Sequence, residues 1–133
     1  MKKVLVSMVI GVALMVAPYC AIGASLTGSV QGFMCVTQGK VCPIGKEDPV
    51  AAVENVFVLL VDAAKGDYYF VPNVDRVVLA RHINEEVRIE GTVDMKMKTI
   101  TASDIYVGSK RIWSGSMQED ILRGFMGPVN PFR

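Results

Sequence analysis

The sequence contains few of the side chains on which catalysis and metal binding usually depend. Its 133 residues include three cysteines, one histidine and one tryptophan. It has no HExxH, GxSxG or GxGxxG motif, and the dipeptide Gly45–Lys46 lacks the rest of a Walker-type phosphate loop. We therefore expect a protein that is not an enzyme and that carries no cofactor.

The sequence also lacks an excess of charge of either sign. Fourteen basic and thirteen acidic side chains give a formal net charge of +1. Nucleic-acid binding usually requires a basic patch, so we expect no nucleic-acid partner. Apolar residues make up 51% of the chain, which is too many for a disordered protein, and the length fits one domain.

The first 24 residues have the pattern of a secretory signal peptide. Lys2 and Lys3 precede an uncharged apolar run over residues 4–17, and Pro18 and small residues follow. Cleavage after Gly23 or Ala24 fits the small-residue rule. The pattern predicts a bacterial protein that is periplasmic or secreted.

The two alternatives to a cleaved signal peptide are a lipoprotein and an uncleaved membrane anchor. A lipoprotein needs a small residue before the lipid-bearing cysteine, whereas Tyr19 precedes Cys20. An uncleaved anchor needs about 20 apolar residues, and residues 4–24 carry no charge. Pro18 and the glycines favour cleavage, so we expect a membrane association only if this segment stays uncleaved.

Removal of residues 1–24 leaves Cys35 and Cys42 as the remaining cysteines. An even pair in an oxidising compartment is typical of a disulfide, which would stabilise the fold by about 2.5 kcal/mol. The spacing is neither CxxC nor CxxCH, so neither a thioredoxin-like redox centre nor covalent haem is indicated.

Periodicity predicts five strands and two helices, all in residues 25–124. Alternating or β-branched runs predict strands at 25–36, 55–62, 67–72, 86–94 and 99–107. Gly28 and Gly32 would let the first strand bend, and a change of inward register predicts a bulge near Ser103. The first helix spans 74–82 with Asn73 as its N-cap and with Val74, Val77 and Val78 on its apolar side. The second begins at a Ser116 capping box and ends at Gly124.

This element order is that of the OB-fold, a mainly β, five-stranded Greek-key barrel with a helix between strands three and four. The segment EEVRIEGTVDMKMKTITASDIYV resembles the closing half of small exported bacterial OB-fold proteins, and SLTGSVQGFMC resembles their opening strand. The resemblance covers residues 25–108 and implies a fold, not a chemistry. We expect an OB-fold domain at 25–113, followed by a short helix and tail at 114–133, in a monomeric protein.

In an OB-fold the ligand commonly crosses strands two and three between two loops, which here are residues 37–54 and 95–98. Four lysines on these loops would suit an anionic ligand: Lys40, Lys46, Lys96 and Lys98. Tyr69 would be exposed if Tyr68 and Phe70 pack inward, and an exposed tyrosine can stack on a ligand. The sequence therefore predicts binding of a small ligand or of an envelope protein.

The other titratable and aromatic side chains have structural interpretations. The carboxylate pairs Glu47–Asp48 and Glu85–Glu86 lie beside turns and are expected on a solvated surface. His82 falls at the predicted end of the first helix, where it can interact with free carbonyl groups. Trp113 is expected to cover one end of the barrel together with the C-terminal helix.

A second hypothesis, of a different class, is a metal or redox accessory protein. If the two loops share one rim, the thiols of Cys35 and Cys42 and the thioethers of Met95 and Met97 would converge. Thiolate and thioether ligands select Cu(I) over harder ions. A disulfide would remove the thiols, and Lys96 and Lys98 would repel a cation.

Thiol titration separates these two hypotheses. Exported protein that is denatured without reductant should show no free thiol, because Cys35 and Cys42 are expected to be bonded to each other. After reduction it should show two. Two free thiols before reduction would contradict the disulfide.

Overall fold

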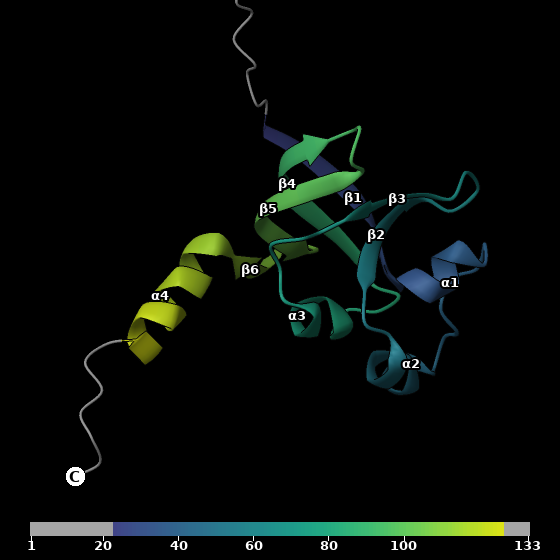
Figure 1. The fold of residues 1–133 in the computed structure, drawn as a ribbon, viewed down its shortest axis with the longest axis horizontal. Coiled ribbons are helices and arrows are strands. Elements are labelled where there is room, and N and C mark those ends of the chain that lie inside the picture. The colour runs from purple at the N-terminus through teal and green to yellow at the C-terminus, as the bar shows by residue number, and fades with distance from the viewer. Residues whose placement is uncertain (1–22, 127–133) are drawn as a thin grey trace, which may run out of the picture.

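The structure is a computed structural model that describes residues 23–126 (Figure 1). The predicted signal peptide falls almost entirely on residues 1–22, and most of the predicted tail on residues 127–133, which lie outside the described residues. Among the described helices, none combines the length and the apolar character that crossing a membrane requires.

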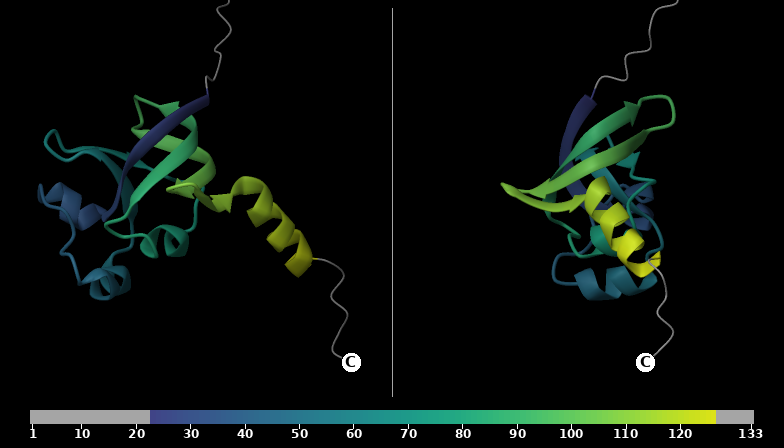
Figure 2. Two further views of the ribbon diagram at one scale, coloured as in Figure 1. Left: turned by 180° about the vertical axis from the view of Figure 1, so that it is seen from behind. Right: turned by 90° about the vertical axis from the view of Figure 1, so that its left-hand side faces the viewer.

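The described part of the chain forms six strands and four helices. In chain order they are β1 (Gly23–Gly32), α1 (Phe33–Thr37), α2 (Glu47–Val53), β2 (Phe57–Asp62), β3 (Asp67–Phe70), α3 (Arg76–Ala80), β4 (Glu86–Asp94), β5 (Thr99–Val107), β6 (Lys110–Ser114) and α4 (Gly115–Met126). The α4 helix projects away from the barrel, on the side opposite to α1 (Figures 1 and 2).

The strands close into a five-stranded mixed barrel. The sheet order is β3-β2-β1-β4-β5-β6, and β3 also meets β5 in parallel where Phe70 pairs with Thr99. The side-chain amide of Asn73 continues this short contact, because it donates to the carbonyl of Ala102 at 2.7 Å and accepts from its N–H at 2.8 Å. The predicted fold is confirmed: mainly β, with a helix between β3 and β4 and a C-terminal helix.

The first strand belongs to both halves of the barrel. Residues 23–29 of β1 pair with β4, and residues 29–32 pair with β2. Gly28 lies where the strand changes partners, and a Cβ atom there would come within 2.4 Å of the carbonyl oxygen of Leu60. The bend predicted at Gly28 is confirmed, because only a residue without a side chain permits this approach.

Alternate residues of the strands fill the barrel, as the sequence predicts for β4 and β5. The fully buried side chains at its centre include Val30, Leu59, Val87, Ile89, Ile100 and Ile105. The bulge near Ser103 is also confirmed. Glu90 pairs with Asp104 and Gly91 pairs with Ala102, which leaves Ser103 unpaired, and its hydroxyl donates to the carbonyl of Glu90 at 3.1 Å.

Two predictions about the first third of the chain were wrong. The first strand ends at Gly32, and Phe33–Thr37 form α1 instead of continuing it. The predicted loop at 37–54 contains α2, whose first turn carries Glu47, Asp48 and Pro49. Acidic residues stabilise the positive end of a helix dipole, and proline is tolerated in a first turn.

The predicted helix starts also needed correction. Asp75, not Asn73, caps α3, since its carboxylate accepts from the N–H of Val77 at 2.8 Å. Val74 is buried and Val78 packs against the core, as predicted, whereas Val77 is 47% exposed and Leu79 is the buried residue of the helix. Asn73 is unable to cap because its amide is already bonded to β5.

The C-terminal part contains a strand that the sequence pattern did not predict. Trp113 lies in β6, is buried, and donates to the side chain of Gln118 in α4 at 3.2 Å, so its contact with the C-terminal helix is confirmed. Ser114, not Ser116, accepts from the N–H of Met117 at 3.2 Å. The helix continues past Gly124 to Met126.

Replacing Gly91 with valine should lower the free energy of unfolding by about 3 kcal/mol or more. A Cβ atom at Gly91 would lie 2.0 Å from the carbonyl oxygen of Thr101, which is fixed in β5. The melting temperature should fall by more than about 10 °C in a domain of this size. The control is Gly124→Ala, because nothing lies within 4 Å of a Cβ there. Equal melting temperatures for the two variants would contradict the close approach of β4 and β5.

Candidate functional site

The three consecutive aromatic residues of β3 face opposite to the prediction. Tyr69 is only 3% exposed and packs in the barrel, whereas Tyr68 and Phe70 are half-buried on its outer side. Tyr69 pairs with Leu59, whose side chain fills the core. The alternation of the strand was therefore predicted correctly, but its inner and outer faces were exchanged.

Tyr69 closes one end of the barrel. Its hydroxyl donates to the sulfur of Met95 at 3.3 Å, and the ammonium of Lys98 lies 4.8 Å from the centre of its ring. Lys98 also donates to the carboxylate of Asp67 at 2.6 Å, and this hydrogen bond raises the pKa of the Lys98 ammonium. A tyrosine that is packed in this way presents no ring face to a ligand.

Phe33, Tyr68 and Phe70 form an outer aromatic patch over β2 and β3. Their ring centres are 5.4 to 6.0 Å apart, with two edge-on contacts and one tilted contact. The three rings are half-buried and rest on the buried side chains of Val36, Val58 and Leu60. The patch lies on the outer face of the second and third strands.

Glu54 positions Phe33 by holding the start of α1. Its carboxylate is almost fully buried and accepts three backbone hydrogen bonds, from Met34 at 2.8 Å, Asn55 at 3.0 Å and Val56 at 3.2 Å. The N–H of Phe33 donates to the carbonyl of Val56 at 2.8 Å. The chain therefore turns outward after β1 and lays the Phe33 ring beside β3.

The disulfide between Cys35 and Cys42 holds the middle of α1, and it confirms the predicted pair. Cys42 is fully buried, its sulfur accepts from the N–H of Gly32 at 3.1 Å, and its N–H donates to the side chain of Gln31 at 2.6 Å. Gln31 in turn donates to Asn84 at 3.1 Å. The disulfide loop is thus fixed to the end of β1.

Arg76 attaches α2 to the same region. Its guanidinium donates to the carbonyl groups of Ala51 at 2.6 Å and Glu54 at 2.7 Å, and it lies 5.6 Å from the ring centre of Phe57. These are the last carbonyl groups of α2, which have no partner within the helix. The long connection between β1 and β2 is therefore an ordered support for the patch.

The predicted lysines do not gather into one site. Lys96 and Lys98 lie at the β4–β5 hairpin, beside the start of β1, because Gly23 pairs with Thr92. Lys46 is the N-cap of α2, whereas Lys40 lines a small hollow with Ala63 and Gly66 of the β2–β3 turn, next to Asp67, the partner of Lys98. The four predicted lysines therefore lie on three different segments of the chain.

The four predicted copper ligands are also separated. Met95 and Met97 lie on the β4–β5 hairpin, whereas Cys35 and Cys42 follow the opposite end of β1 and are bonded to each other. Within residues 23–126, no three His, Cys, Asp or Glu side chains are grouped so that they could hold a metal ion. The arrangement offers no converging set of soft ligands.

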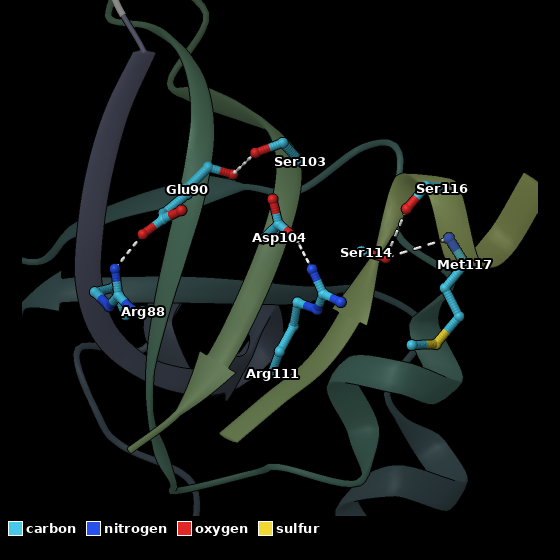
Figure 3. A network of polar contacts seen from close by, with 8 residues as sticks. All are labelled: Arg88, Glu90, Ser103, Asp104, Arg111, Ser114, Ser116 and Met117. Carbon is cyan, nitrogen blue, oxygen red and sulfur yellow. Dashed lines mark hydrogen bonds and ion pairs between the residues drawn. The ribbon is translucent and has the colours of Figure 1, made fainter. Parts of the chain in front are cut away.

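The outer side of β4, β5 and β6 carries compensated charges (Figure 3). Arg88 pairs with Glu90 and lies 4.3 Å from the ring centre of Tyr106, and Arg111 pairs with Asp104 at 3.4 Å. All four charged side chains are partly exposed, and such surface pairs contribute about 1 kcal/mol or less. This face presents no charge of one sign to a ligand.

Three of the four predicted solvated carboxylates, those of Glu47, Asp48 and Glu85, border one hollow of about 540 Å³ between α2 and the α3–β4 connection. Glu47 accepts from Asn84 at 3.0 Å, which lowers the pKa of the Glu47 carboxyl, and His82 contacts Glu85 at 2.7 Å. Arg81 also lines this hollow. The Glu47 carboxylate is thus bonded to Asn84, and the Glu85 carboxylate to His82. No cysteine, serine or threonine lines the hollow as a nucleophile.

Replacing Glu54 with glutamine should lower the free energy of unfolding by about 1 to 3 kcal/mol. The amide nitrogen of glutamine would face backbone N–H donors, which leaves at least one of the three hydrogen bonds unmade. Hydrogen exchange should accelerate at Met34, Asn55 and Val56. The control is Glu119→Gln on exposed α4, which should change stability by less than about 0.5 kcal/mol. Unchanged exchange at Met34 would contradict this role of Glu54.

Comparison of the chain with protein family models, with curated proteins and with solved structures found no match. The fold assignment therefore rests on the order and closure of the strands themselves. The candidate site rests likewise on the position of the outer aromatic patch on β2 and β3.

Proposed function

We propose that this protein is a binding domain of the bacterial cell envelope, without catalysis, that docks a partner on the outer aromatic patch. The observation that carries the proposal is the cluster of Phe33, Tyr68 and Phe70 on the outer side of β2 and β3. Aromatic rings supply large contact areas, and this face is the usual ligand face of the fold.

The shape of the patch favours an envelope partner over a small enclosed ligand. Small-molecule sites are usually concave, with volumes of about 300 to 1,000 Å³. The hollow beside the patch, between Val36, Leu60 and the Gly39–Val41 segment, measures about 40 Å³. A nearly flat apolar surface suits an extended chain that lies across it.

The side chains of the patch favour a peptide as that chain. Phe33 and Phe70 carry no hydrogen-bonding group, and Tyr68 carries one hydroxyl, whereas a glycan site needs several directed polar groups for the sugar hydroxyls. Apolar contacts with an extended peptide need only ring edges and faces. The signal-peptide pattern of residues 1–24 supports the envelope as the place of action, since it predicts export.

Titration of the protein with a panel of probes, monitored by the NMR shifts of its backbone amides, tests this proposal. The probes are proline-rich and aromatic-rich peptides, with chito-oligosaccharides as the competing class. Shifts should gather at residues 33–36, 58–60 and 68–70, and Tyr68→Leu with Phe70→Leu should weaken binding at least tenfold, because leucine keeps the apolar packing but removes the rings.

The matched control is Tyr106→Leu, which removes a half-buried ring on the outer side of β5 and should leave binding unchanged. Shifts confined to β4, β5 and β6 would overturn the proposed site. Binding of the oligosaccharides alone would overturn the peptide class.

A further inference from the structure

The sequence that follows α4 contains a proline pair with the spacing of a recognition motif. Residues 127–133 read GPVNPFR, so that Pro128 and Pro131 form a P-x-x-P segment directly after Met126. Such segments favour the polyproline II helix, and they are bound by shallow surfaces lined with aromatic rings. The outer aromatic patch is such a surface on the same chain.

We propose that the Pro128–Pro131 segment of one copy docks on the outer aromatic patch of a second copy. This inference rests on the proposed function, because it names the peptide that the patch binds. It replaces the monomer that the sequence predicts with a self-associating protein.

The two prolines are spaced more widely than the rings of the patch. A polyproline II helix has three residues per turn and rises about 3.1 Å per residue, so two prolines three positions apart share one side at a spacing of about 9 Å. The patch has three rings whose centres are 5.4 to 6.0 Å apart, and they meet edge-on or tilted. A segment with this spacing is long enough to contact more than one ring of the patch.

The position of α4 requires a second copy. The helix leaves the barrel at β6 and lies at the opposite end of the molecule from α1 and the β2–β3 turn (Figures 1 and 2). Pro131 is five residues beyond Met126, a reach of about 17 Å at most. A chain of this length that starts at the end of α4 is too short to return to the patch on the opposite side of its own barrel.

Contacts with β6 hold only the start of α4. Ser114 caps its first turn, and Trp113 bonds to Gln118, whereas no α4 side chain is buried in the barrel. Near its end, Ile121, Phe125 and Met126 are 54%, 80% and 83% exposed. In the sequence these apolar residues are followed directly by Gly127 and Pro128.

Such a contact is heterologous, because it joins two different surfaces of the chain. In a pair of docked copies, one copy keeps an unoccupied patch and the other keeps an unbound P-x-x-P segment. Further copies can therefore add at both ends, which gives an open, linear oligomer. The average mass should therefore rise steadily with protein concentration.

Sedimentation of the exported full-length protein tests the inference. The average mass should rise with concentration for the wild type and stay that of one chain for Pro128→Ala with Pro131→Ala. It should also stay so for Tyr68→Thr with Phe70→Thr, in which threonine keeps the strand preference. Tyr106→Thr, which removes a ring outside the patch, should associate as the wild type does.

Mixing the two deficient variants gives the sharpest result. The proline variant has an intact patch and the patch variant has intact prolines, so together they should form a one-to-one complex that neither forms alone. The synthetic peptide GPVNPFR should bind the proline variant and shift the amides of residues 68–70. Because the proline changes lie outside the barrel, this variant tests the patch even if the threonine variant does not fold.

Three results would overturn the inference: a wild type that stays one chain at millimolar concentration, a proline variant that associates like the wild type, or no binding of the peptide. If another proline-rich peptide shifts the patch amides while GPVNPFR does not, this inference fails and the proposed function stands. If no peptide of the panel shifts them, the proposed function fails as well.

Discussion

The pairing of β1 with two different strands determines the rest of the structure. Residues 23–29 pair with β4 and residues 29–32 pair with β2, so a single strand joins the two halves of the barrel. The curvature this requires brings backbones too close for side chains at Gly28 and Gly91. On β5 the bulge at Ser103 leaves one residue unpaired in the ladder, and such a bulge bends the strand further.

The end of β1 also determines where the candidate site lies. After Gly32 the chain has no further partner strand to follow, and the buried carboxylate of Glu54 supplies acceptors that let α1 begin there. The disulfide and Gln31 then fix the segment against the barrel. Phe33 is thereby brought beside Tyr68 and Phe70, although 35 residues separate it from the first of them.

The outer faces of the barrel differ in what they offer a partner. On β4, β5 and β6 the charges are paired, and a partner there would have to break ion pairs in exchange for new ones. On β2 and β3 the half-buried rings are already partly removed from water and carry no charge. Covering them with an apolar chain loses few hydrogen bonds, which is the physical reason to favour this face for binding.

The sequence by itself determined the class of fold, the inward-facing residues of β4 and β5, the bulge and the disulfide pair. The strands and the bulge follow from the local alternation of apolar and polar residues, and the disulfide follows from the presence of only two cysteines after residue 24. The sequence left open which face of β3 is inside. Alternation groups Tyr68 with Phe70 and separates Tyr69, but only the pairing with Leu59 assigns Tyr69 to the core. Tertiary structure likewise decided that Phe33–Thr37 form a helix, since its acceptor is a carboxylate twenty residues later. It also placed the methionines and the cysteines at opposite ends of β1, because strand order, not loop composition, decides which loops meet.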